Sequence, residues 1–582
     1  MPNADRRLPD AERRAPDADG RAPIFLWVHL YDPHAPYVGG YDAEVQRADA
    51  ETGRLLQEAR AAGRDPVVIV VSDHGESLGD HGEATHGMLV YDAALRVPLI
   101  VAGPGISAAR RDDPVSLVDV AATLARLGGV TEPIGGSARD LLGPPAADRE
   151  IYAESQYPRV AGWSPVHTLV QDRWKLVVSR GSELYDLASD AAEQHDVAAS
   201  RQNLVTAMGT RLATLRAAKT AASDASRAKS DASPDVARGN AARSDRSPRA
   251  PGSGASPGAR GSTASPSAPG SAASPGATAS TASRSATGST AAPRATASEV
   301  AERLRALGYV AASTRPIEVG EGDNPAEHIA AWGEFETALA ELGQRDKAVL
   351  PRLRKLATTY PDAPVFQSTY ARALLDSDSP RDALVVYRRA VTRWTDDPAL
   401  FHDLAVAARA AGHADEALKA EQAALTIEPS LPSAHNGVGL LMADAGRHAD
   451  ATAAFERAAS GDPTNAEYWV NLGNARRTAG HTRGAAEAYR RAADLDPRSA
   501  DAANGLGVLL VEEKRAAEAV PLFERAVSAA PDFVEARLNL AIAYQESGQR
   551  ERAAAAYRDV LARARPGSRE RQAAAELLRN LR

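Results

Sequence analysis

Carboxylates and histidines gather directly after one apolar run of the sequence. The run at residues 67–71 leads straight into Ser72-Asp73-His74-Gly75-Glu76, and His81 and His86 follow. A carboxylate supplies a hard oxygen ligand and an imidazole supplies a nitrogen ligand or a proton. We interpret the group as a metal or anion site, because ligands of open α/β sheets collect where strands end. The alternative is that these side chains are structural and bond the backbone of a turn.

The elements around this group predict an α/β region. The apolar runs at residues 24–28 and 67–71 are short enough to be buried strands, and they alternate with helical patterns. Residues 116–128 predict a helix with Ser116 as its N-cap and with Gly128 ending it in the left-handed conformation. Residues 167–187 predict a strand, a tight turn, a second strand, another turn and a short last strand. The expected architecture is a parallel or mixed sheet with helices.

A 34-residue period organises the C-terminal half. Small residues, aromatic residues and prolines recur at fixed sites of each unit, and this period is typical of tetratricopeptide helix pairs. Seven units are expected, starting near residues 330, 364, 398, 432, 466, 500 and 534. The periodic positions include Pro429, Pro463, Pro497, Pro531, Gly412, Gly446, Gly480 and Gly548. The predicted all-α solenoid offers an extended surface for a protein or peptide.

Composition divides the chain further. We expect an unstructured stretch at 1–22, the α/β region at 23–217 and a disordered linker rich in Ala, Ser, Pro and Gly at 218–298. A helical connector at 299–329, repeats at 330–567 and a capping helix at 568–582 complete the prediction.

Charge and residue content narrow the classes of function. The net charge of −8 offers no general basic field, so nucleic acid is not an expected partner. The sequence contains no cysteine, which excludes disulfides, thiolate ligands and cysteine nucleophiles within it. We find no signal peptide and no apolar run long enough for a membrane span, so the localisation stays open.

Several segments together resemble successive landmarks of the sulfatases, in the alkaline phosphatase superfamily. They are FLWVHLYDPHAPY, YDAEVQRAD, VIVVSDHGESLGDHGEATHGMLVYDAALRVPLIVAGPG, ELYDLASDAAEQHDVA and LRALGYV. The resemblance implies that Asp73 and His74 hold a divalent cation, calcium in most members. It also implies that His34 and His86 line the pocket for the sulfate ester. Family members are often exported to the bacterial envelope.

The sequence also departs from that family. Sulfatases carry a C/S-x-P-x-R motif whose Cys or Ser matures to formylglycine, the nucleophile, and these 582 residues contain no such motif. One hypothesis is a truncated sulfatase, a metal-dependent sulfuric ester hydrolase that is inactive without the nucleophile segment. A second is a catalytically dead scaffold or adaptor that works through its repeats. A third is a phosphoethanolamine or phosphoglycerol transferase-like enzyme, which the segments at residues 31–37, 90–100 and 183–187 disfavour.

Overall fold

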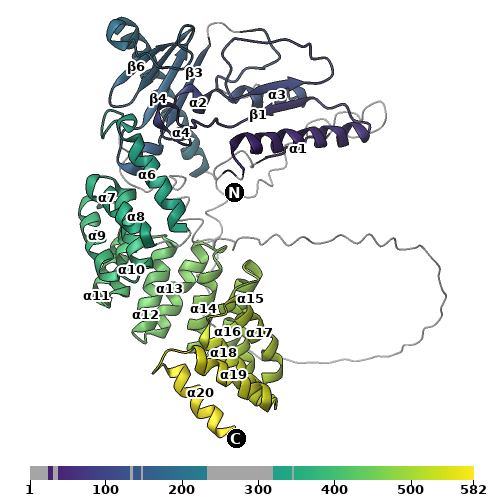
Figure 1. Ribbon diagram of the computed structural model, residues 1–582, viewed down its shortest axis with the longest axis vertical. Helices are drawn as coiled ribbons and strands as arrows, with labels where there is room; N and C mark the ends of the chain where they lie inside the picture. The colour runs from purple at the N-terminus through teal and green to yellow at the C-terminus, as the bar shows by residue number, and fades with distance from the viewer. Residues whose placement is uncertain are drawn as a thin grey trace, which may run out of the picture. The chain divides into compact units, whose positions relative to one another are not determined.

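The computed structural model describes residues 24–30, 37, 39–130, 136–145, 149–231, 319–343 and 347–581. We call the described part up to residue 217 the α/β region, and residues 319–581 the helical array (Figure 1). The expected unstructured stretch at 1–22 lies outside the described residues, as do residues 232–298 of the expected linker and 299–318 of the connector.

The first described segment does not form the predicted strand. Residues 24–28 have no regular secondary structure, and Ile24 and Trp27 are 67% and 72% exposed. The prediction was wrong because an apolar run becomes a strand only where a neighbouring strand takes up its backbone hydrogen bonds. The chain then forms the long helix α1, Tyr41–Ala61.

Two short strands lie on either side of the histidine-rich segment. Strand β1, Val68–Val71, pairs antiparallel with β2, Leu99–Ala102, so that Val68 faces Ala102. Between them lie the 3₁₀ turn η1, Asp80–Gly82, and the short helix α2, Asp92–Leu95. The predicted β1 is confirmed, but the expectation of a parallel or mixed sheet is wrong for the described strands. The connection returns the chain beside β1 without a crossover helix, which a parallel pair would require.

The predicted helix at 116–128 is α3, Val118–Leu127, with two differences at its ends. Leu117 takes the N-cap position that was expected for Ser116. Gly128 ends the helix with a φ of −73°, so it does not adopt the expected left-handed conformation. The following residue, Gly129, has a φ of 80° and so adopts the left-handed conformation.

The second sheet is a four-stranded antiparallel meander. Its strands are β3, Glu150–Ser155; β4, Val166–Gln171; β5, Trp174–Val178; and β6, Ser182–Asp186. The last three occupy the predicted strand–turn–strand–turn–strand segment. Leu169, Leu176 and Leu184 are fully buried along this sheet. The 3₁₀ turn η2, Tyr157–Ala161, lies between β3 and β4. A further 3₁₀ turn, η3 (Ala198–Ser200), precedes helix α4, Gln202–Asp231.

Helix pairs follow one another through the array (Figure 1). From α8 onwards, the first helices of successive pairs begin at residues 364, 398, 432, 466, 500 and 534, at intervals of 34. The first helices are α6 (Pro325–Gly343), α8 (Pro364–Asp376), α10 (Pro398–Ala410), α12 (Pro432–Asp444), α14 (Ala466–Thr478), α16 (Ala500–Glu512) and α18 (Val534–Glu546). The second helices are α7 (Leu350–Thr359), α9 (Pro380–Arg393), α11 (Ala414–Ile427), α13 (His448–Gly461), α15 (Thr482–Leu495), α17 (Ala516–Ala529) and α19 (Arg550–Arg563), and α20 (Arg569–Asn580) follows.

From the α8–α9 pair onwards, each turn within a pair uses one residue in the left-handed conformation. This backbone favours glycine, because a Cβ would approach the following carbonyl oxygen. Gly412, Gly446, Gly480 and Gly548 take this role, and Asp378 and Lys514 adopt it at the corresponding sites of two other units.

Glycines inside the helices make room for aromatic rings. A Cβ added to Gly473 of α14 would lie 2.6 Å from Tyr489 Cδ1, and one added to Gly505 of α16 would lie 2.5 Å from Tyr489 Cε1. Gly507 has the same relation to Phe523. Tyr489 therefore packs between two glycine surfaces from different units, which brings neighbouring helix pairs close together.

The beginning of the array shares a hydrophobic core with the α/β region. Trp163 of the α/β region makes edge-on ring contacts with Trp332 of α6 and Phe366 of α8, at centroid distances of 6.3 and 6.1 Å. Residues 88–91 belong to the same buried cluster. Helices α6 and α8 are thus packed as part of the core that supports the histidine-rich segment.

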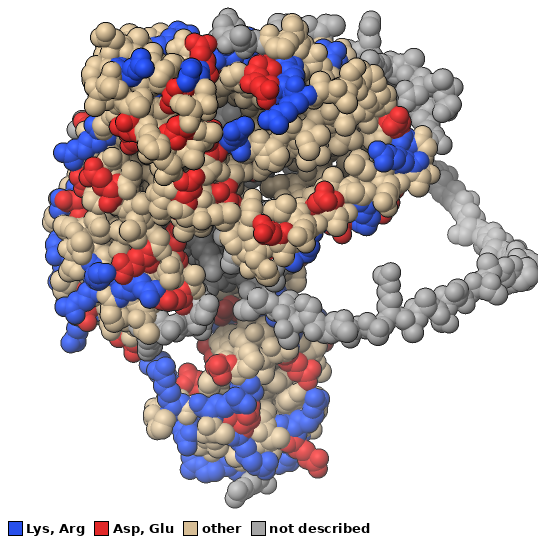
Figure 2. All heavy atoms as spheres, turned by 45° about the horizontal axis from the view of Figure 1, so that its top comes forward, with Lys and Arg blue, Asp and Glu red and all other residues tan. Residues whose placement is uncertain are grey.

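Charged residues of both signs are interspersed over the face shown in Figure 2. This mixed surface agrees with the modest net charge of −8.

Candidate metal centre

The carboxyl end of β1 forms a tight turn that aims His74. The Ser72 hydroxyl donates to the His74 carbonyl oxygen at 2.6 Å, and the His74 amide donates to Asp73 Oδ1 at 3.1 Å. The Gly75 amide donates to the Ala94 carbonyl at 2.8 Å, which ties this turn to α2. His74 Nδ1 lies 3.0 Å from the Gly75 carbonyl oxygen. An Nδ1–H donor in this contact makes Nε2 the ligating nitrogen of His74.

Three side chains meet beyond this turn. Ligand atoms of His74, Glu76 and His86 all lie within 4.8 Å of one another, and we call these three residues the histidine cluster. His86 Nδ1 is 3.1 Å from Glu76 Oε1, and the two imidazoles stack with centroids 3.9 Å apart. Ligand atoms around a tetrahedral cation with N and O donors lie about 3.4 Å apart. The donor types of the cluster therefore suit a divalent cation, and its ligand atoms lie within 4.8 Å of one another.

A buried carboxylate folds the segment between Glu76 and His86 back on itself. Glu83 Oε2 accepts from the Ser77 hydroxyl at 3.0 Å, and Glu83 Oε1 accepts from the Met88 amide at 2.7 Å. The Ser77 amide also donates to the Thr85 carbonyl at 2.8 Å. Burial raises the pKa of Glu83, although these hydrogen bonds to its carboxylate oppose the shift. The resulting loop brings His86 to Glu76, ten residues away.

Negative charge surrounds the cluster. Burial lowers the pKa of His86, but the hydrogen bond to Glu76 and the charges of Glu76, Glu83 and Glu336 outweigh it, so the pKa of His86 lies above its usual value. Burial and the nearby charge of Glu76 also raise the pKa of Tyr37 well above its normal range. The surroundings thus favour a positive charge at this position.

A second buried polar group holds the α/β region together. Lys175 of β5 is fully buried, and its Nζ lies 2.7 Å from Asp92 Oδ1 and 2.6 Å from Glu193 Oε1. We call Lys175, Asp92 and Glu193 the lysine cluster. The Asp92 amide donates to Glu193 Oε2 at 2.6 Å. Burial raises the pKa of Glu193, and the Lys175 charge opposes this shift.

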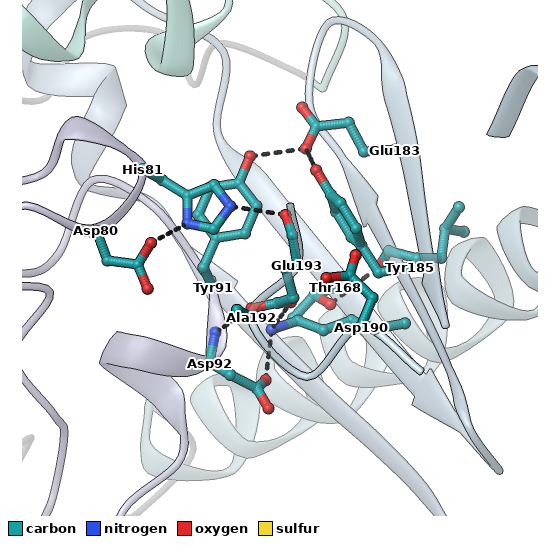
Figure 3. Close-up of polar contacts among 12 residues, drawn as sticks. Asp80, His81, Tyr91, Asp92, Thr168, Glu183, Tyr185, Asp190, Ala192 and Glu193 are labelled. Atoms are coloured by element: carbon teal, nitrogen blue, oxygen red, sulfur yellow. Dashed lines mark hydrogen bonds and ion pairs between the residues drawn. The ribbon is translucent and has the colours of Figure 1, made fainter. Parts of the chain in front are cut away.

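Aromatic and histidine side chains extend the lysine cluster (Figure 3). His81 Nε2 lies 2.9 Å from the Glu193 carbonyl oxygen, and the His81 ring stacks on Tyr91 at 3.6 Å. The Tyr91 and Tyr185 hydroxyls both donate to Glu183 Oε2 at 2.7 Å. His81, which the sequence grouped with the candidate site, therefore contacts the lysine cluster.

The structure brings together only some of the site residues expected from the sequence. His74 and His86 are neighbours, whereas the Asp73 side chain is 76% exposed with its Oδ1 3.9 Å from His74 Nε2. His34 lies outside the described residues. Sequence reasoning did not assign a role to Glu76, although its position two residues after His74 was a usable signal.

Fold and site together define an α/β protein with a candidate cation site, joined to a helical repeat array. Residues 1–130 match the family model for sulfatases. Residues 369–432, 402–466 and 470–532 match one tetratricopeptide repeat model, and residues 510–578 match another. The chain therefore combines a sulfatase-family region with tetratricopeptide repeats, which confirms both predicted families.

Curated relatives match the sulfatase-family part. An uncharacterized sulfatase of Escherichia coli K12 is 31% identical over 26% of this chain and 31% of its own length. The choline-sulfatase of Rhizobium meliloti is 29% identical, over 27% of this chain and 32% of its own length, and arylsulfatase K of Bos taurus is 28% identical, over 30% and 35%. The chain thus spans about a third of the length of these relatives.

Solved repeat structures are also similar to this chain. The MamA protein is 25% identical, with a TM-score of 0.26, over 28% of this chain and 91% of its own. YrrB, a tetratricopeptide protein with an unusual peptide-binding site, is 19% identical, with a TM-score of 0.27, over 33% of this chain and 97% of its own.

Among the helices of the described residues, none has the length and apolar character needed to cross a membrane.

Proposed function

We propose that the α/β region forms part of the active site of a metal-dependent sulfuric ester hydrolase, and that the helical array binds a protein or peptide. The observation that supports the enzymatic part is the convergence of His74, Glu76 and His86 at the end of β1, inside the segment that matches the sulfatase family. The repeat match supports the binding part, because arrays of this kind present an extended surface.

The side chains of the proposed site have different chemical roles. His74 offers a ligating nitrogen whose direction is fixed through Gly75, Glu76 offers a carboxylate oxygen, and Asp73 can add an oxygen from the exposed side. A bound divalent cation would supply Lewis acidity toward an ester oxygen. His86, whose pKa is raised, presents a positive charge to an anionic ester group, and we propose the same role for His34.

The donor set bears on the identity of the cation. Calcium takes oxygen ligands, whereas imidazole suits zinc and other transition ions. The His74 imidazole in this donor set therefore favours manganese or zinc over calcium. Calcium, which the family resemblance implies, would depend more on the Asp73 and Glu76 oxygens.

Cation binding is tested by titration calorimetry of the EDTA-treated protein with Mn²⁺, Zn²⁺ and Ca²⁺. We expect His74→Ala to weaken binding by more than about tenfold, because losing even a supporting partner of a ligand typically costs 10- to 100-fold. His448→Ala is the matched control, since His448 is exposed in the array. Equal affinity in the His74→Ala protein and the wild type would show that the proposed site is wrong.

Hydrolysis needs a nucleophile as well as a cation. The 582 residues contain no C/S-x-P-x-R motif, and we predict that this chain by itself does not turn over an aryl sulfate. Release of the aryl product by the purified protein, lost in the His74→Ala variant, would contradict that prediction. If the protein neither binds a cation nor turns over sulfate, but retains a partner through its repeats, the scaffold hypothesis replaces the enzymatic one.

A further inference from the structure

One face of α6 packs against the segment that carries the histidine cluster. Ile329, Trp332 and Glu336 are spaced three and four residues apart, so they lie on one side of the helix. Ile329 is buried, and a Cβ added to Gly82 would lie 3.0 Å from its Cγ2. Trp332 is 1% exposed, with its ring edge-on to Tyr157 at 5.2 Å.

Glu336 is the charged member of this face. The Thr85 hydroxyl donates to Glu336 Oε1 at 2.9 Å, across 251 residues of sequence, and Thr85 immediately precedes His86. Burial raises the pKa of Glu336, while the hydrogen bond from Thr85 and the charge of His86 oppose that shift. Glu336 is thus a partly buried carboxylate held beside the cluster by a side chain of the cluster's own loop.

We propose that Glu336 is a positioning residue of the candidate site, which fixes the Thr85–His86 segment from the helical array and adds negative charge that favours a bound cation. The cation part rests on the proposed function, whereas the positioning part rests on the Thr85 contact alone. The first helix of the array then forms a wall of the site. Local order at His86 depends on α6 remaining docked.

Two substitutions at Glu336 separate its hydrogen bond with Thr85 from its charge. Glu336→Gln keeps an oxygen that accepts from Thr85 and removes the charge, whereas Glu336→Ala removes both. The matched control is Glu334→Gln on the same helix, where the carboxylate faces Lys355 at 3.3 Å. All proteins are compared as full chains.

Amide hydrogen exchange of the peptide covering residues 83–90 measures the positioning. We expect exchange to rise about tenfold in Glu336→Ala, the effect of losing one hydrogen bond to a charged group, and to stay near wild type in Glu336→Gln and Glu334→Gln. Thr85→Val should reproduce the alanine result, since it removes the same hydrogen bond. Unchanged exchange in both Glu336→Ala and Thr85→Val would overturn the positioning role.

Calorimetric titration with Mn²⁺ measures the charge effect. We expect Glu336→Gln to lower the affinity about tenfold, as for other residues that support ligands without touching the ion, and Glu334→Gln to leave it unchanged. Wild-type affinity in Glu336→Gln would overturn the charge role. A wild-type protein that binds no cation would overturn that role together with the proposed function, and the exchange experiment would still decide the positioning role.

Discussion

The lysine and histidine clusters are both polar groups of the α/β region, yet their charges are balanced differently. In the lysine cluster, a fully buried ammonium lies within 2.7 Å of two carboxylates, and all the charge comes from the chain. In the histidine cluster, Glu76 faces two imidazoles, with Glu83 and Glu336 nearby. The first arrangement suits a structural lock. The second leaves negative charge that an ion from solution can offset.

The largest loss of stability is expected when the ion pairs of the lysine cluster are broken. Lys175→Met keeps much of the side-chain volume but leaves the buried Glu193 and the partly buried Asp92 carboxylates without their cation. Breaking a buried ion pair in this way typically costs about 3–5 kcal/mol. Urea unfolding followed by tryptophan fluorescence should show a loss of this size. A loss below about 1 kcal/mol would mean that the cluster is hydrated and not a lock.

Supplying the missing charge should stabilise the histidine cluster. A ligand at one hundred times its dissociation constant stabilises the state that binds it by about 2.7 kcal/mol. We expect Mn²⁺ at that excess to raise the melting temperature of the wild type. His74→Ala should lose most of the increase, while His448→Ala should keep it. An equal increase in all three proteins would indicate that the ion binds elsewhere.

A smaller effect should follow from loosening the connection to α6. A Cβ added to Gly322 would lie 2.7 Å from the Gly162 carbonyl oxygen, whereas one added to Gly320 meets nothing within 4 Å. Both glycines have positive φ values, 79° and 91°, so both alanine variants carry similar backbone strain.

We expect Gly322→Ala to be less stable than Gly320→Ala by about 1–3 kcal/mol, the usual cost of overpacking. Hydrogen exchange should rise at residues 83–90 and stay constant at β5. Equal increases in exchange at residues 83–90 and at β5 would show that the histidine and lysine clusters depend on α6 to the same degree.

The smallest loss of stability is expected from replacing an exposed lysine. Lys355→Met removes a pair with Glu334 in which the Lys355 side chain is 69% exposed, and such pairs contribute about 0–1 kcal/mol. The same substitution at Lys175 and Lys355 thus compares a buried ion pair with a surface pair. Urea midpoints that shift equally for the two variants would contradict the distinction.

Local sequence patterns predicted the parts of the fold that depend on neighbouring residues. The 34-residue period reflects contacts within and between adjacent units, and β4, β5 and β6 are joined by short turns. Both kinds of element bury their apolar faces against nearby chain, so their residue patterns are sufficient. Residues 24–28 show the limit of this reasoning, because an apolar run does not specify its partner.

The candidate site was only partly predictable for the same reason. His74 follows a strand, so the sequence could single it out as a candidate, whereas Asp73 lies outside the histidine cluster. The contact between Glu76 and His86 depends on Glu83 closing a loop, which no spacing rule reveals. Glu336 comes from 251 residues beyond Thr85, and its position depends on the packing of α6.

The glycine surfaces around Tyr489 bear on how the number of repeat units can change during evolution. Tyr489 contacts Gly473 within its own unit and Gly505 in the next, and the same glycine–aromatic relation recurs at Gly507 and Phe523. The glycine that faces the ring from within its own unit recurs every 34 residues, as Gly439, Gly473 and Gly507. Duplicating one of these whole units would therefore keep a glycine against the ring of that unit. Gain or loss of part of a unit would place a side chain against the ring. Array length can therefore evolve in whole units, independently of the α/β region.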